Sequence, residues 1–269
     1  MQMQDNVGSI AFIIFYLTTI WIFIVKIIAS NAKKNTLKER PSSWKWTLLA
    51  YFLLGFGDLF HLGVRIYVFF AGLGPDEHIT NLSFAIGYVA TGLSMTYFYI
   101  AMLHAWIEIY GEKYSTPKKN RFYLIYEYAL FAIRIILVFL PYNRWYEGDA
   151  TVDFGFDFRI ISSLPIYGIG LLTVYLMLKT SKKEASSGSL QQSKRTISID
   201  PQVNEGTRKA AWSFVVSYAC YSLTNFFVAI EPLLGMAMIP KTIAYMVAFY
   251  FHYKYFLNRK TEEFTNREH

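Results

Sequence analysis

Seven long apolar runs divide this sequence, and each is close to the length of a helix that crosses a lipid bilayer. Inside hydrocarbon, backbone N–H and C=O groups have no water to bond, so a chain that crosses repeatedly must satisfy them within helices. The pattern predicts an all-α polytopic membrane protein: one membrane domain with a seven-transmembrane-helix bundle. The predicted spans are 9–28, 48–70, 83–110, 122–140, 158–178, 210–230 and 236–256.

Composition favours the same class. Hydrophobic residues make up 54% of the chain and charged residues 17%, whereas about a quarter of a soluble domain is charged. Many of the 21 Tyr and 23 Phe lie near the ends of the runs, where aromatic rings favour the headgroup region. A net charge of +7 would suit nucleic acid, but the basic residues cluster between the runs, so we expect no nucleic-acid partner.

The basic residues also predict the direction of the chain. Of 26 Lys and Arg residues, 21 lie in or beside 31–45, 111–121, 179–209 and the C-terminal end, while Arg144 lies in a connection of the opposite side. Because Lys and Arg favour cytoplasmic connections, the N-terminus is predicted outside and the C-terminus in the cytoplasm. Residues 179–209, rich in Ser, Gln and Lys, are predicted to be a mobile cytoplasmic connection and a candidate contact for a cytoplasmic protein.

The second run carries three ionisable residues within GDLFHLGVR at 57–65. Asp58, His61 and Arg65 are spaced i, i+3 and i+7, which places them on one face of a helix. At membrane depth such groups are costly unless they pair or face a polar cavity. We therefore expect all three to point into the bundle, with Asp58 or His61 within hydrogen-bonding reach of a polar group on the third or fourth run.

Small residues predict where helices approach closely. In the second and third runs they are Gly55, Gly57, Gly63, Gly87, Gly92 and Ser94.

Other polar residues fall in the outer half of the predicted bundle when depth is counted at about 1.5 Å per residue. They are Arg134, Arg159, Asn225, Glu231 and Lys241. With Asp58, His61 and Arg65 they form our predicted ligand-binding set. Two interpretations stay open. The charges neutralise one another, with Arg134 the expected partner of Asp58 and Lys241 that of Glu231, or their surplus positive charge holds an anion or an anionic headgroup.

A second polar set is predicted near the cytoplasmic side. His104, Glu108, Glu127 and His252 suit hydrogen bonding near headgroups, with a metal site or proton relay as the alternative. The single cysteine, Cys220, lies in an apolar run, where it suits a small core side chain. We expect no cofactor and no stoichiometric metal.

Three motifs carry a resemblance that covers most of the chain: GDxFHLxxR at 57–65, PxNxW at 141–145 and MIPKTxAY at 238–245. Together they resemble a functionally unassigned group of bacterial multi-pass membrane proteins. The resemblance implies a bacterial inner-membrane location and no particular activity.

A looser similarity is to the alkaline ceramidase and progestin-receptor-like superfamily of seven-span hydrolases. Those proteins use a Ser, an Asp and three His around zinc, with an HxxxH pair in the last span. Asp58 and His61 match two of these roles, whereas Ala248 and Phe256 stand where a second His would accompany His252.

The expected function is therefore that of a receptor-like or carrier-like protein that binds a small anion or anionic amphiphile in an outward-facing cavity, with membrane lipid as a partner. The first alternative is an intramembrane hydrolase or lipid-modifying enzyme that uses Asp58 and His61 as an acid/base pair. The second is a structural membrane protein with internally paired charges.

Overall fold

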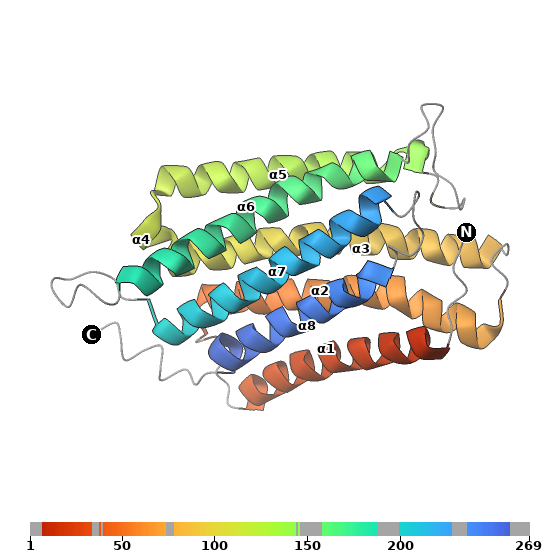
Figure 1. Ribbon diagram of the computed structural model, residues 1–269, viewed down its shortest axis with the longest axis horizontal. Coiled ribbons are helices and arrows are strands. Elements are labelled where there is room, and N and C mark those ends of the chain that lie inside the picture. The colour runs from red at the N-terminus through yellow and green to blue at the C-terminus, as the bar shows by residue number, and fades with distance from the viewer. Residues whose placement is uncertain are drawn as a thin grey trace. The chain divides into compact units, whose positions relative to one another are not determined.

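The computed structural model describes residues 7–33, 38, 40–73, 78–143, 145, 158–187, 199–227 and 236–258. Within these ranges the regular structure is helical and no strand occurs, which confirms the all-α prediction. A helix lies over the described part of each of the seven predicted runs, as Figure 1 shows. In chain order the elements are α1 Val7–Lys33, α2 Ser42–Ala71, α3 His78–Trp106, η1 Ile107–Gly111, α4 Glu112–Tyr114, α5 Pro117–Phe139, η2 Pro141–Asn143, α6 Phe158–Ser187, α7 Pro201–Phe227, α8 Met238–His252 and η4 Tyr253–Leu257.

Five helical segments are long and apolar enough to cross a membrane, so the multi-pass membrane character of the prediction holds. They are Val7–Ala32, Ser42–Ala71, Asn81–Tyr114, Pro117–Phe139 and Phe158–Ser186. The third of these runs through a π-helical turn, η1, into α4. Over their described residues, α7 and α8 are not among these five segments. α7 opens with the polar sequence PQVNEGTRK, and the 15 residues of α8 are shorter than a membrane-spanning helix.

Helices extend into both ends of the connection predicted over 179–209. α6 continues to Ser187, and its last turns are fixed by an ion pair of 2.7 Å between Lys113 Nζ and Glu184 Oε2. α7 begins at Pro201, and the carboxylate of Asp200 accepts the Gln202 N–H at 2.8 Å. An Asp cap followed by Pro is a helix-start signal that the compositional argument did not use. The middle of the predicted connection, 188–198, lies outside the described residues.

The residues group into two compact units, which are described separately. Unit 1 comprises Met1–Ile22, Ala50–Ile100 and Ile125–Gly170. Unit 2 comprises Phe23–Leu49, Ala101–Leu124 and Leu171–His269.

In unit 1, α2 and α3 approach closely at glycines. A Cβ added to Gly87 would lie 2.9 Å from the Phe60 carbonyl oxygen and 3.0 Å from His61 Cα. One added to Gly57 would lie 1.8 Å from Ser94 Oγ, and the Gly57 carbonyl accepts a 2.7 Å hydrogen bond from Thr91 Oγ1. These two contacts confirm the small-residue prediction at Gly57 and Gly87.

The same prediction is wrong at Gly63. A Cβ there would meet only Leu59 Cδ1 of the same helix, at 3.9 Å, so no other described helix comes within 4 Å of that position. The glycine spacing of α2 therefore does not by itself mark a packing face.

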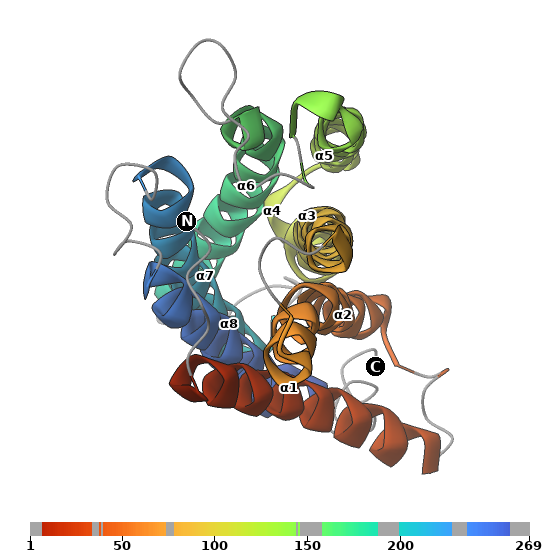
Figure 2. The same cartoon turned by 90° about the vertical axis from the view of Figure 1, so that its right-hand side faces the viewer.

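In unit 2, α7 and α8 lie side by side, as both views show (Figure 1 and Figure 2). They run antiparallel, because the start of α7 meets the turn after α8: a Cβ on Gly206 would lie 2.7 Å from Tyr255 Cβ. Farther along, the rings of Phe214 and Tyr245 lie 6.1 Å apart. The indole of Trp44, in the first turn of α2, donates a hydrogen bond of 2.9 Å to the Leu257 carbonyl. This bond joins the buried end of η4 to the start of α2 within unit 2.

Candidate functional site

The eight predicted site residues divide between the two units. Asp58, His61, Arg65, Arg134 and Arg159 all belong to unit 1. Asn225 and Lys241 belong to unit 2, and Glu231 lies outside the described residues, so the predicted pairing of Glu231 with Lys241 does too. The described contacts therefore define one cluster of predicted site residues, and it lies in unit 1.

The polar face of α2 is turned toward protein. Asp58, His61 and Arg65 are half-buried, whereas their neighbours Leu59 and Phe60 are 44% and 39% exposed. Polar side chains that face protein and apolar side chains that face outward are the arrangement expected when the surroundings are hydrocarbon.

Asp58 accepts a hydrogen bond from the hydroxyl of Tyr16 on α1. Tyr16 is fully buried, so its ring and hydroxyl are held in place by packing. Sequence reasoning looked for partners of Asp58 on the third and fourth runs and did not consider the first. The available signal was a hydroxyl-bearing ring inside an otherwise apolar helix, which needs a partner when buried.

A row of stacked groups links two of the predicted residues. The Arg159 guanidinium lies 5.5 Å from the Trp145 ring, Trp145 stacks on Tyr88 at 5.8 Å, and Tyr88 packs against His61 at 4.9 Å. The row thus runs from α6 through Trp145 and α3 to α2, with a cation at one end and an imidazole at the other. Tyr88 and Trp145 were not among the predicted site residues.

The turn after α5 positions this row. The Asn143 side chain is buried, and its amide donates to the carbonyls of Leu137 at 2.6 Å, Val138 at 3.2 Å and Leu140 at 3.2 Å, so it caps α5. The Asn143 carbonyl in turn accepts the Arg159 Nε–H at 3.0 Å. The Trp145 indole donates to Val138 O at 2.8 Å, which accounts for the PxNxW motif: it closes a helix and places a ring and an arginine.

Arg134 is the most buried of the described arginines of unit 1. On α5 it is only 4% exposed, and its Nη2 lies 3.2 Å from where a Gly92 Cβ would stand, so the missing side chain of Gly92 makes room for the guanidinium. The described carboxylates of unit 1 are Asp58 and the buried Glu127, and its described arginines are Arg65, Arg134 and Arg159. The described helices of unit 1 therefore carry ionisable side chains of both signs.

The two described site residues of unit 2 lie on α7 and α8. The Lys241 ammonium is 4.8 Å from the Tyr221 ring, a cation–π contact between these helices. The Asn225 side chain is half-buried, and its Nδ2 has no hydrogen-bond partner among the described residues.

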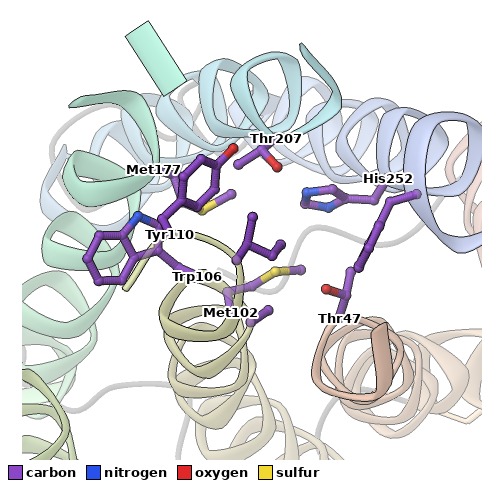
Figure 3. A pocket seen from close by; sticks show the side chains of 10 residues that line it. Thr47, Met102, Trp106, Tyr110, Met177, Thr207 and His252 are labelled. Carbon is purple, nitrogen blue, oxygen red and sulfur yellow. The ribbon is translucent and has the colours of Figure 1, made fainter. Parts of the chain in front are cut away.

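Unit 2 also contains a small cavity, shown in Figure 3. His252, Thr207, Thr47 and Tyr110 supply its polar groups, and the Tyr110 hydroxyl donates to Asn204 Oδ1 at 3.0 Å. The rest of its wall is apolar: Met102, Ala105, Trp106, Ile109, Met177 and Phe256. Its volume of about 10 Å³ is roughly the space of one water molecule, which is too small for a substrate.

The second polar set of the sequence prediction is divided between the two units. His104 stacks on Trp46, with ring centroids 4.1 Å apart, and His252 lines the cavity, whereas Glu127 belongs to unit 1. Within the described residues no three His, Cys, Asp or Glu side chains lie close enough to hold a metal ion. The expectation of a protein without stoichiometric metal stays a prediction.

Comparison of the chain with protein-family models, with curated proteins and with solved structures gives no match.

Proposed function

We propose that this protein is a receptor-like or carrier-like membrane protein that binds a small anion or an anionic amphiphile through the arginines of unit 1. The observation that carries the proposal is the buried guanidinium of Arg134 on α5, for which Gly92 of α3 leaves room. An ionisable side chain inside a membrane protein is a candidate functional group, and a guanidinium attracts anions. Arginine suits this role because its planar fork of five N–H donors matches carboxylate and phosphate groups.

The row from Arg159 to His61 supports an amphiphile in particular. Its rings offer apolar surface, and the guanidinium at one end offers donors to an acidic head. Asp58, fixed by Tyr16, sets a negative group in the same unit, which favours ligands that also carry a donor.

The topology belongs to the same proposal: seven spans, with α7 and α8 as the last two, the N-terminus outside and a bacterial inner-membrane location. It is supported by the distribution of charge, because the described basic residues of the predicted cytoplasmic connections all belong to unit 2.

We expect single cysteines to report this topology, on a Cys220→Ser background. Ser187→Cys lies on the proposed cytoplasmic side, so an impermeant thiol reagent should reach it only after cells are permeabilised. Tyr142→Cys, exposed in η2 on the proposed outer side, is the positive control and should be labelled in intact cells. Labelling of Ser187→Cys in intact cells would contradict the proposed direction of the chain.

Binding is tested by the thermal stability of the protein purified in a neutral detergent. Two matched pairs of probes separate the sources of charge: phosphate against chloride at equal ionic strength, and oleate against oleyl alcohol. We expect one anionic probe to stabilise the protein, by about 2.7 kcal/mol at a hundred times its Kd. A rise with phosphate indicates a small anion, and a rise with oleate alone indicates an amphiphile.

Variants assign the effect to the site. Arg134→Gln and Arg159→Gln should each lose most of the stabilisation, while Arg121→Gln, an exposed arginine of unit 2, should keep it. Equal shifts from charged and neutral probes, or an undiminished shift in both site variants, would refute anion binding and leave the charges a structural role.

The alternative function is an intramembrane hydrolase or lipid-modifying enzyme with Asp58 and His61 as its acid/base pair. Their half-buried positions one turn apart on α2 are the observation that favours it. We expect purified protein to carry no stoichiometric zinc, since a catalytic zinc site normally takes three protein ligands. Metal analysis that finds about one zinc per chain, lost in His61→Ala, would make the enzyme the better account.

A further inference from the structure

A patch of cations and rings lies where the start of α7 meets the end of α8 and η4. The Lys209 ammonium of α7 is 5.2 Å from the Tyr255 ring, and that of Lys254 is 5.3 Å from the same ring. Lys209 also lies 5.4 Å from Phe251, and Lys254 lies 6.0 Å from Tyr250. Two positive charges from different helices therefore converge on one tyrosine; we call these five residues the lysine–tyrosine patch.

The charge of the patch stays positive after its neighbours are included. Glu205 pairs with Arg208 at 2.6 Å and with Lys209 at 3.2 Å, so two cations share one carboxylate and Lys254 adds a further positive charge at Tyr255. Hydrogen bonds with Glu205 and with the Tyr255 hydroxyl, 3.4 Å away, raise the pKa of Lys209 above its ordinary value. Lys209 is therefore fully protonated at neutral pH.

Apolar side chains continue from the patch along both helices. On α7, Trp212 and Val216 follow Arg208 at helical spacing and are 60% and 50% exposed. On α8, Tyr250, Val247 and Ile243 lead away from Lys254 in the same manner and are exposed. Because the helices are antiparallel, each presents the same order from its middle to this end: aliphatic, aromatic, cationic.

That order matches the order of groups in a phospholipid within a leaflet. Aliphatic side chains suit acyl chains, Trp and Tyr favour the headgroup boundary, and lysines extend their ammonium groups to the polar surface. A zwitterionic headgroup would bring no net charge to meet the positive patch, whereas an anionic one would.

We propose that the lysine–tyrosine patch is a binding site for an anionic phospholipid, whose phosphate accepts hydrogen bonds from Lys209 and Lys254 while its acyl chains lie along Trp212 and Val247. The site lies in unit 2 and shares no residue with the arginines of unit 1. It accounts for the convergence of Lys209, near the start of α7, and Lys254, after α8, on one tyrosine.

The test measures thermal unfolding of the purified protein in neutral detergent with added phosphatidylglycerol or phosphatidylcholine of equal acyl composition. We expect phosphatidylglycerol to raise the unfolding midpoint of the wild type more than phosphatidylcholine does. Lys209→Gln with Lys254→Gln should lose at least half of that difference. The matched control, Lys118→Gln with Lys119→Gln, removes two exposed lysines of unit 2 outside the patch and should keep it.

A second measurement needs no variant. Raising NaCl from about 0.05 M to about 0.5 M should reduce the phosphatidylglycerol preference of the wild type, because the contact is electrostatic and near solvent. The proposal is overturned if the wild type shows no preference, if the patch variant keeps the whole difference, or if the control loses as much. Stabilisation by soluble polyglutamate without any effect of phosphatidylglycerol would indicate an acidic protein segment and also overturn it.

Discussion

Replacing Asp58 by alanine is expected to lower the free energy of unfolding by about 3 kcal/mol, because the buried hydroxyl of Tyr16 loses the carboxylate that accepts its hydrogen bond. Tyr16→Phe removes only the hydroxyl that donates to Asp58 and should cost about 1.5–3 kcal/mol, as a hydrogen bond to a charged group does. Reversible unfolding in mixed micelles measures both.

The double variant separates this contact from general disruption. If Tyr16 acts through Asp58, Tyr16→Phe with Asp58→Ala should cost less than the sum of the single changes. Asp58→Ala with Arg134→Met tests the sequence-predicted pairing in the same way: if the two side chains pair, the double variant should recover part of the loss. Strict additivity in both cycles would show that Asp58 is coupled to neither residue.

Gly87→Ala is expected to destabilise the protein by about 2–3 kcal/mol, the cost of inserting a methyl group into a tight contact. The added Cβ would stand 2.9 Å from the Phe60 carbonyl oxygen and 3.0 Å from His61 Cα. Both are backbone atoms, which cannot relieve a clash by a change of rotamer. α2 would have to move at His61, so loss of the anion response should accompany the loss of stability.

Gly63→Ala is the matched control, the same substitution in a helix of the same unit. Its Cβ would meet only Leu59 Cδ1 at 3.9 Å, so the change should stabilise the helix by about 0.5–1 kcal/mol through reduced backbone entropy of the unfolded chain. If Gly87→Ala were as stable as Gly63→Ala, the close approach of α2 and α3 at Gly87 would be contradicted.

Sequence periodicity predicted the helices well because hydrophobic run length and helix formation depend on the same local residues. It failed where a helix continues beyond its apolar part. The polar first turns of α7 begin at the Asp200–Pro201 cap, a local signal that hydropathy does not register. The end of α6 depends on Glu184 meeting Lys113, a contact between segments far apart in the sequence.

The candidate site was likewise predicted in part: residue spacing on one helix was informative, and contacts between helices were not foreseen. Spacing alone placed Asp58, His61 and Arg65 on one face, and all three are half-buried. The stacking partners Tyr88 and Trp145 were missed, since in an aromatic-rich chain nothing in the sequence distinguishes a ring that stacks on a site from one that packs at the membrane boundary. Tyr16 was missed because partners of Asp58 were sought on the third and fourth runs alone. Gly57 and Gly63 likewise look alike in the sequence, and only the position of α3 separates them.

The central claim, that the arginines of unit 1 hold an anion, is tested most directly by an experimental density map of the purified protein prepared with oleate and, separately, with phosphate. The proposal predicts ligand density within hydrogen-bonding distance of the guanidinium of Arg134 or Arg159, lost in the Arg134→Gln protein. A map in which these guanidiniums contact only protein carboxylates and carbonyls, with no ligand density beside them, would contradict it.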